Sequence, residues 1–293
     1  MQLSIIVIFH NMRREAARTL YSLSPRYQQD VTADDYEVIA IDNGSDTPLD
    51  PKSVTTLGAN FHYLNHPTTS ISPAKAMNIG AEMATTSNLA FIVDGARMAS
   101  PGLIRKTLDA LRLHQTSFVT ALAWHLGPDI QNCSMLKGYD QNREDQLLDT
   151  INWPEQGYDL FTIACIAPSS RYGFLGDIPP ECSWLALPRA VFDALGGYDL
   201  RFQSGGGGLV NHDLRNRAME HPGLRPVLLL GEGVFHQFHG GIATNATFDH
   251  HPMIQFKAEY HQIRGTEYSV HPTPEVTYYG SLPRQARRFF LFE

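Results

Sequence analysis

Over its first 125 residues the chain alternates between continuous apolar runs and segments whose apolar residues recur at helical spacing. Continuous runs are typical of strands buried on both faces, whereas apolar residues three or four positions apart indicate helices. The pattern predicts strands at residues 3–9, 36–41, 61–64, 89–93 and 117–123. It predicts helices at residues 13–23, 72–84 and 101–113, the last with Ser100 as its N-cap. Such strand, helix, strand units form parallel sheets that gather ligands at the carboxyl ends of their strands.

The rest of the chain keeps this alternation only in part. Residues 125–180 carry several prolines among polar residues, which predicts long loops or an insertion. Beyond them we predict strands at residues 183–187 and 227–230 and helices at residues 189–195 and 213–220. The whole pattern indicates an α/β fold with helices on both faces of a mostly parallel, Rossmann-like sheet.

Composition narrows the possible function classes. The formal net charge of -7 gives no overall attraction to a polyanion, so nucleic acid is not an expected partner. We predict no transmembrane segment, because no stretch reaches the roughly 18 to 20 consecutive apolar residues of a span. The first strand lacks the flanks of a signal peptide, so we expect a cytoplasmic protein. We interpret Cys133, Cys165 and Cys182 as reduced core residues.

Residues 284–292 mix arginines with phenylalanines. One interpretation is a weak contact with a membrane surface or a partner subunit. The other, which we favour, is a last helix that packs Phe289 and Phe292 onto the body of the protein.

Two aspartates follow predicted buried strands. Asp42 ends the second strand, where its carboxylate could accept bonds from a nucleoside or form a simple Asx turn. Asp94 ends a later strand, so both aspartates should open onto one crevice. A carboxylate at such a position is suited to hold Mg²⁺ or Mn²⁺ between the protein and substrate phosphates.

Other candidate residues surround this crevice. His236 and His239 lie three apart after the last predicted strand and could complete a mixed Asp/His metal site, a set better suited to Mn²⁺. Arg97 could pair with Asp94 or bind a phosphate. Residues 205–208 are four glycines without the spacing of a dinucleotide fingerprint or a phosphate-binding loop, and we interpret them as a mobile loop over the site.

Four segments, in this order, resemble the family 2 glycosyltransferases of the GT-A fold. They are residues 3–11, VIAIDNGSD at 38–46, SPAKAMNIGAEMATTSNLAFIVDGARMASPGLI at 72–104, and GGYDLRFQSGGGGLVNHDL at 196–214. The resemblance implies a GT-A domain over 1–241 with a C-terminal extension, 242–293, packed on the same domain. Within it a nucleotide-binding half covers about 1–125, a loop-rich insertion about 125–181 and an acceptor-side half about 182–241.

The resemblance also implies roles for single residues. The donor-binding set would be Phe9, Asp42, Asn43, Asn78, Asp94, Gly95 and Arg97, and the metal ligands would be Asp94, His236 and, less favoured, His239. The family's Asp-x-Asp motif is Asp94-Gly95-Ala96 here, so its second carboxylate is missing and a requirement for Mn²⁺ or Mg²⁺ is in question.

The catalytic-base segment departs from the family as well. Asn211 stands where the base should be, and an amide cannot take a proton. Asp213 or His212 could replace it, and we favour Asp213, whose alternative role is to cap the helix at residues 213–220.

The activity implied is transfer of a sugar from a nucleoside diphosphate sugar, UDP- or GDP-linked, to a glycan or other hydroxyl acceptor with inversion. The alternative is a GT-A-like protein that binds the nucleotide sugar but has lost turnover. A nucleotidyltransferase is disfavoured, because no Gly-rich, Lys-containing loop follows the first strand.

Overall fold

The computed structural model describes residues 1–289, and the ten strands of this part form one mixed sheet. The strand order is β10-β9-β6-β8-β4-β1-β2-β3, with β5 paired to β9 and β7 paired to β6. The strands are β1 (Leu3–Phe9), β2 (Tyr36–Asn43), β3 (Phe61–His66), β4 (Asn88–Ile92), β5 (Arg97–Ala99), β6 (Ser117–Leu126), β7 (Ala164–Ile166), β8 (Leu185–Pro188), β9 (Arg225–His236) and β10 (Thr277–Tyr279).

The sheet consists of two parallel parts joined by one inverted strand. β4, β1, β2 and β3 are parallel neighbours, and so are β6, β9 and β10. β8 is antiparallel to both β4 and β6, so its amino end lies at the edge where those strands end. Every predicted strand is present, whereas the short strands β5, β7 and β10 were not predicted because three residues give too little periodicity.

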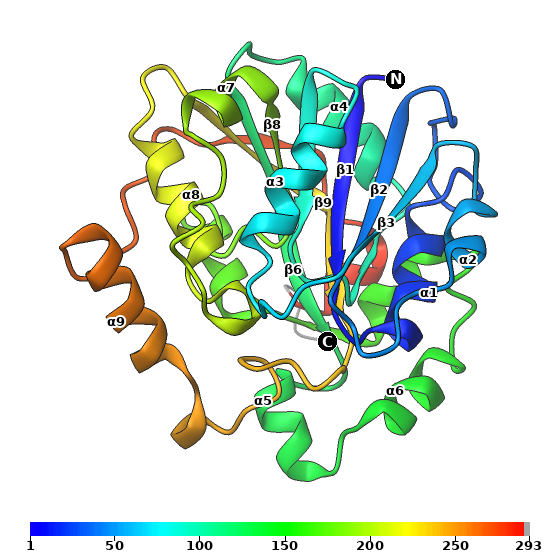
Figure 1. Ribbon diagram of the computed structural model, residues 1–293. Helices are drawn as coiled ribbons and strands as arrows, with labels where there is room; N and C mark the ends of the chain where they lie inside the picture. The colour runs from blue at the N-terminus through cyan, green and yellow to red at the C-terminus, as the bar shows by residue number, and fades with distance from the viewer. Residues whose placement is uncertain (290–293) are drawn as a thin grey trace.

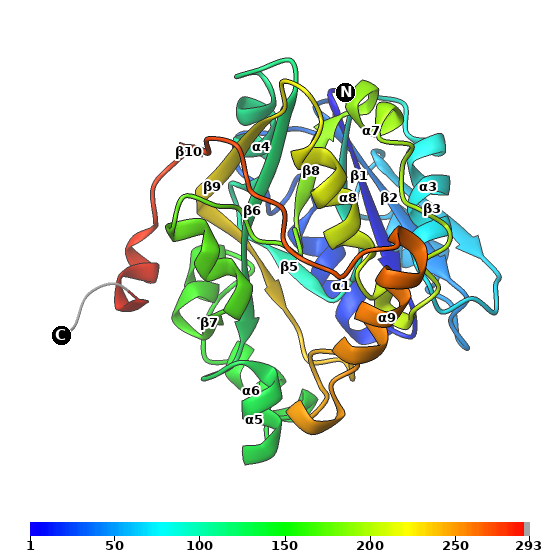
Figure 2. The same ribbon diagram turned by 90° about the vertical axis from the view of Figure 1, so that its left-hand side faces the viewer.

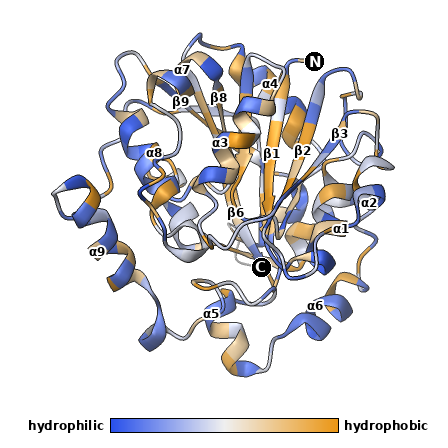
Figure 3. Cartoon of the chain, viewed as in Figure 1, coloured by the Kyte–Doolittle hydropathy of each residue, from blue (hydrophilic) through white to orange (hydrophobic). Residues whose placement is uncertain are grey.

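Helices cover both faces of the sheet (Figure 1). Alternate side chains of β1 and β2 pack against α1 and α4 on one face and against α3, α7 and α8 on the other. The apolar strands therefore lie between more polar outer helices (Figure 3). The longer helices are α1 (Arg13–Ser22), α2 (Pro51–Thr55), α3 (Ala74–Met83), α4 (Leu103–Leu111), α6 (Gln141–Leu148), α7 (Arg189–Ala194), α8 (Val210–Met219) and α9 (Met253–Arg264).

The predicted loop-rich insertion contains regular structure. It holds α5 (Gln131–Ser134), α6, β7 and three 3-10 turns, Met135–Lys137, Gly157–Thr162 and Pro168–Phe174. In both views α5 and α6 lie beyond the end of the sheet where β1 and β2 end, whereas α9 lies to the side, next to α8 (Figures 1 and 2). The C-terminal segment contributes β10, which adds to the same sheet beside β9.

Several local predictions need correction. The N-cap of α4 is Gly102 and not Ser100. The Ser100 hydroxyl donates instead to the buried Glu232 carboxylate at 2.5 Å. The cysteines are free thiols, but only Cys182 is fully buried. Phe289 does pack on the body, with its ring centroid 4.7 Å from that of Trp124, whereas Phe292 lies outside the described residues.

Within residues 1–289, no helix is both long enough and apolar enough to cross a membrane.

Candidate active site

A cavity of about 710 Å³ opens at the edge of the sheet where its parallel strands end. Its lining includes residues at the carboxyl ends of β1, β4, β2 and β6, namely His10, Asp94, Asn43 and His125. The glycine run Gly205–Gly208 and residues at the start of α8 form the opposite wall. The position is the one that parallel α/β sheets use for ligands, as predicted.

Three candidate metal ligands meet at this edge. The Nε2 atom of His236 lies 2.8 Å from one carboxylate oxygen of Asp94, and Nε2 of His239 lies 3.5 Å from the other. The two imidazole Nε2 atoms are 3.2 Å apart. β5 creates this arrangement, because it runs antiparallel to β9 and sets Arg97 opposite His236. The turn that carries Asp94 therefore lies against the end of β9.

Gln131 determines which nitrogen of His236 carries hydrogen. Its side-chain nitrogen donates to the His236 carbonyl at 3.0 Å, so its oxygen must face Nδ1 of His236, which it does at 2.8 Å. Nδ1 is then the donor, and in the neutral ring Nε2 has only a lone pair. That lone pair faces the Asp94 oxygen and the second imidazole, an unfavourable arrangement unless a proton or a cation lies between them.

Burial disfavours the proton. Burial lowers the pKa of His236 to about 4. Asp94 acts to raise this pKa and Arg97 acts to lower it further, but burial is the largest of the three effects. Burial also acts against charge on Asp94 and His239, but the two imidazoles hold the pKa of Asp94 well below its ordinary value, and Asp94 raises the pKa of His239. The cluster therefore stabilises positive charge beside Asp94.

The residues fit a divalent transition metal. All three ligand atoms lie within 4.8 Å of one another, and ligands about 2.1 Å from a metal are about 3 Å apart in neighbouring positions. Two imidazoles and one carboxylate favour Mn²⁺ or a softer ion over Mg²⁺, which prefers oxygen ligands. Ala96, at the place of the missing second carboxylate, is fully buried, and His239 lies beside Asp94, where it could supply a ligand in its stead.

Arg97 gives the cavity a fixed positive charge next to this cluster. One guanidinium nitrogen lies 3.5 Å from the Asp94 carboxylate, and the side chain is 13% exposed. Because Arg97 also lines the cavity, it can pair with Asp94 and still reach an anionic ligand.

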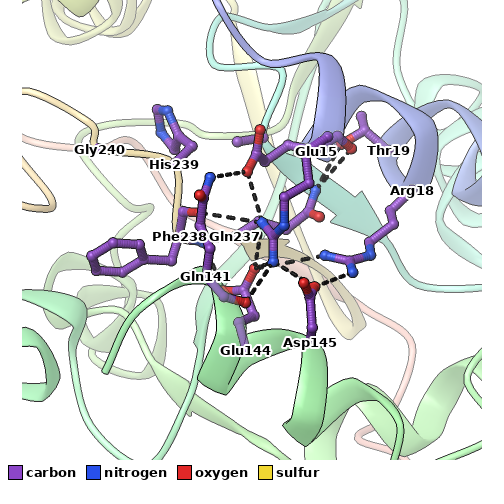
Figure 4. A network of polar contacts seen from close by, with 12 residues as sticks. Glu15, Arg18, Thr19, Gln141, Glu144, Asp145, Gln237, Phe238, His239 and Gly240 are labelled. Atoms are coloured by element: carbon purple, nitrogen blue, oxygen red, sulfur yellow. Dashed lines mark hydrogen bonds and ion pairs between the residues drawn. The ribbon is translucent and has the colours of Figure 1, made fainter. Parts of the chain in front are cut away.

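The segment that carries His239 is anchored by α1 and α6 (Figure 4). The backbone N–H of Phe238 donates to the buried Glu144 carboxylate at 2.7 Å. Gln237 donates to the carbonyl of Glu15 and to the hydroxyl of Thr19. Burial raises the pKa of Glu144 to about 7, even though Arg14 lies beside it. This support lies on the inserted helix α6, which the sequence did not indicate.

Asp42 holds the loop after β2, a structural role close to the predicted alternative of an Asx turn. Its two oxygens accept the backbone N–H groups of Ser45 at 3.0 Å and Leu49 at 2.9 Å, and the residue is fully buried. Among the described residues it is not part of the cavity lining, whereas its neighbour Asn43 is. The predicted nucleoside contact of Asp42 is therefore corrected to a structural role.

Three further predicted donor-site residues, Phe9, Gly95 and Asn78, have structural surroundings. Phe9 is fully buried and packs over Gly95, where an added Cβ would lie 2.4 Å from its ring. Asn78 joins α3 to Tyr198 through hydrogen bonds of 2.8 and 2.9 Å to its backbone. In the described part of the chain none of the three lines the cavity, so each serves packing or loop anchoring.

The proposed catalytic residues have different surroundings. Asn211 and His212 line the cavity, but Asp213 is 1% exposed and bonds to the guanidinium groups of Arg217 and Arg264. Asp213 is also not the N-cap of α8, which begins at Val210. Its carboxylate is therefore a buried ion-pair partner, and its assignment as base loses support.

Sequence reasoning missed three residues of this edge: His125, Gln131 and Glu181. The signal for His125 was available, since β6 continues to Leu126 and ends at the cavity like β4. Gln131 and Glu181 lie in the insertion, where neither periodicity nor a motif indicated their positions.

The fold and this site define a GT-A type α/β protein with its candidate site at the strand ends. A family model described as "Glycosyl transferase family 2" matches residues 4–163. The chain belongs to this family. No curated protein matches it.

The solved structures that resemble this chain include TarS from S. aureus. A structure of TarS residues 1–349 with UDP-GlcNAc has a TM-score of 0.53 at 13% identity, and the match covers 89% of this chain and 67% of that TarS segment. The same TarS segment alone has a TM-score of 0.50 at 13% identity, and the match covers 81% of this chain and 60% of that segment. Its complex with UDP has a TM-score of 0.50 at 14% identity, and the match covers 82% of this chain and 61% of that segment. In the first of these two comparisons the match spans 60% of the TarS segment, and at such identities the likeness establishes the GT-A fold alone.

Proposed function

We propose that this chain is a nucleotide-sugar-dependent glycosyltransferase that transfers a sugar to a hydroxyl acceptor with inversion. The observation that carries the proposal is the meeting of Asp94, His236 and His239 beside Arg97, at the edge of one cavity. A cation held by the first three would offset charge on a departing diphosphate. The family membership and the strand-end position of the cavity support the same reading.

The residues themselves have distinct tasks in this proposal. Asp94 and the two imidazoles hold the cation, Gln131 keeps Nε2 of His236 available as a ligand, and Arg97 binds a phosphate oxygen. A UDP-sugar is our first choice of donor, with a GDP-sugar second, since TarS structures contain UDP and UDP-GlcNAc. A glycan hydroxyl is the proposed acceptor, which would make this a step of glycan or polysaccharide synthesis.

The second candidate is a binding protein without turnover. Asn211 at the expected base position and the double ion pair of Asp213 favour it. It predicts nucleotide-sugar binding with no release of nucleoside diphosphate from any donor.

A thermal-shift panel tests both candidates. We expect one of UDP, GDP, CDP and dTDP to raise the Tm by several degrees with Mn²⁺ present, because a ligand of the folded state stabilises it. The shift should be much smaller without Mn²⁺ and in Asp94→Asn. If no nucleotide at millimolar concentration raises the Tm, the donor assignment fails. If one does, a turnover assay separates a transferase from a binding protein.

A further inference from the structure

An inverting transferase needs a group that removes the proton from its acceptor hydroxyl, and the expected groups are poorly suited to this. Asn211 is an amide, and both oxygens of Asp213 are held by arginines. Nδ1 of His212 lies 2.6 Å from the Tyr268 hydroxyl. Burial, with Arg215 nearby, lowers the pKa of His212 to about 4, which makes it a weak base.

Glu181 is a carboxyl group that faces the cavity with little support from the described part of the chain. It lines the cavity, and within residues 1–289 neither of its side-chain oxygens has a hydrogen-bond partner although both are buried. The hydroxyl of Ser169 is close without meeting hydrogen-bond geometry. A buried carboxyl without partners is costly, and a catalytic role is one of the reasons for which such a group is kept.

The position of Glu181 matches the missing base. The side-chain nitrogen of Asn211 donates to the backbone carbonyl of Glu181 at 3.1 Å, so the two residues are direct neighbours. The inverted strand β8 brings Glu181 to this place, because its amino end lies at the edge where β4 and β6 end. Arg97 is near enough to interact electrostatically with Glu181, which ties the carboxyl to the donor side of the cavity.

We propose that Glu181 is the general base of the transfer, replacing the carboxylate that is absent at Asn211. This inference rests on the proposed function. One oxygen of the Glu181 carboxylate accepts the proton of the acceptor hydroxyl as that hydroxyl's oxygen bonds to the anomeric carbon. The bond from the anomeric carbon to the diphosphate oxygen breaks, and the nucleoside diphosphate leaves with the electron pair. Burial raises the pKa of Glu181, which brings it closer to the range in which a carboxylate is an efficient base.

The test compares five proteins: wild type, Glu181→Gln, Glu181→Gln with Asn211→Asp, Asp94→Asn, and the exposed control Glu155→Gln. Release of UDP from UDP-N-acetylglucosamine is measured with water as acceptor and then with added oligosaccharides. UDP affinity is measured in parallel, with Mn²⁺ present, as a check on folding. We expect Glu181→Gln to reduce turnover about 100-fold or more with UDP affinity unchanged, since general bases contribute roughly 10²–10⁴-fold.

The double variant should recover at least about tenfold of that loss, because it restores a carboxylate at the neighbouring position. The proposal is overturned if Glu181→Gln keeps wild-type turnover, or if it loses UDP affinity and turnover together while Glu155→Gln does not. Wild-type turnover that disappears in Asp94→Asn but persists in Glu181→Gln would reject the base and leave the proposed function intact. A wild type that binds UDP without any turnover would reject both.

Discussion

Asp42 and Asp94 occupy equivalent places in the chain, each just at the carboxyl end of a buried strand, yet their surroundings differ. The Asp42 carboxylate is enclosed by the loop after β2 and satisfied by two backbone N–H groups. The Asp94 carboxylate faces two imidazoles and a guanidinium that come from β5, β9 and the loop beyond. The turn after β4 gives Asp94 one backbone donor, the N–H of Ala96 at 3.1 Å, whereas the loop after β2 gives Asp42 two. A strand-end aspartate is therefore available to a ligand where the local turn leaves one of its oxygens without a backbone donor.

The largest effect should separate these two aspartates. Asp94→Asn weakens a cation ligand and should reduce turnover about 100-fold or more, since the metal contributes several kcal/mol to such a reaction. Asp42→Asn should instead lower the free energy of unfolding by about 1–3 kcal/mol, because one N–H would face an amide nitrogen. Urea unfolding and UDP release on both variants measure the contrast. If a folded Asp42→Asn protein lost its affinity for UDP, the two aspartates would not differ in the way that we predict.

Glu144, which anchors the segment on the Asp94 side, should make the stability of the protein depend on pH. Its pKa is about 7 in the folded protein against an ordinary 4.5, so between these values the folded state holds more protons than the unfolded state. The free energy of unfolding should therefore fall as pH rises from 4.5 to 7, by about 3 kcal/mol at about 1.4 kcal/mol for each pKa unit.

In Glu144→Gln this contribution should disappear. Urea unfolding at pH 5 and pH 8 gives the slope, and the exposed control Glu155→Gln should keep the wild-type value. An unchanged slope in Glu144→Gln would mean that Glu144 ionises normally in the folded protein.

Gln131 offers a finer test of the metal cluster. Gln131→Leu should weaken Mn²⁺ binding about 10–100-fold, because partners that orient metal ligands contribute that much. Gln131→Glu keeps an acceptor for Nδ1 of His236, so its affinity for Mn²⁺ should fall less than that of Gln131→Leu. Calorimetric titration with Mn²⁺ measures both. Equal affinity in wild type and Gln131→Leu would show that His236 needs no such partner.

The smallest effect is expected at Asn78, which resembled a donor residue in the sequence. Asn78→Ala removes two hydrogen bonds to Tyr198 and should cost about 1–2 kcal/mol of stability with UDP affinity unchanged. A drop in UDP affinity at wild-type stability would return Asn78 to the donor site.

The strand ends of the sheet were predictable because long apolar runs are local and strong signals. They correctly indicated the α/β fold, the edge where the cavity lies and the meeting of Asp94 with His236 and His239. The ordered motifs also indicated the family. The failures have one physical cause: a side chain's partner decides its role, and those partners are distant in sequence. Asp213 is held by Arg264, 51 positions away, and Phe238 by Glu144, 94 positions away.

The sequence alone determined the layers of this protein and the edge at which a ligand would be held, because burial and periodicity act over a few residues. Only the tertiary structure decided which carboxylates face that ligand. Pairing of β5 with β9 sets Asp94 against the two histidines, and the inversion of β8 carries Glu181 into the cavity. Strand direction and pairing depend on contacts across the whole sheet, which no local pattern contains.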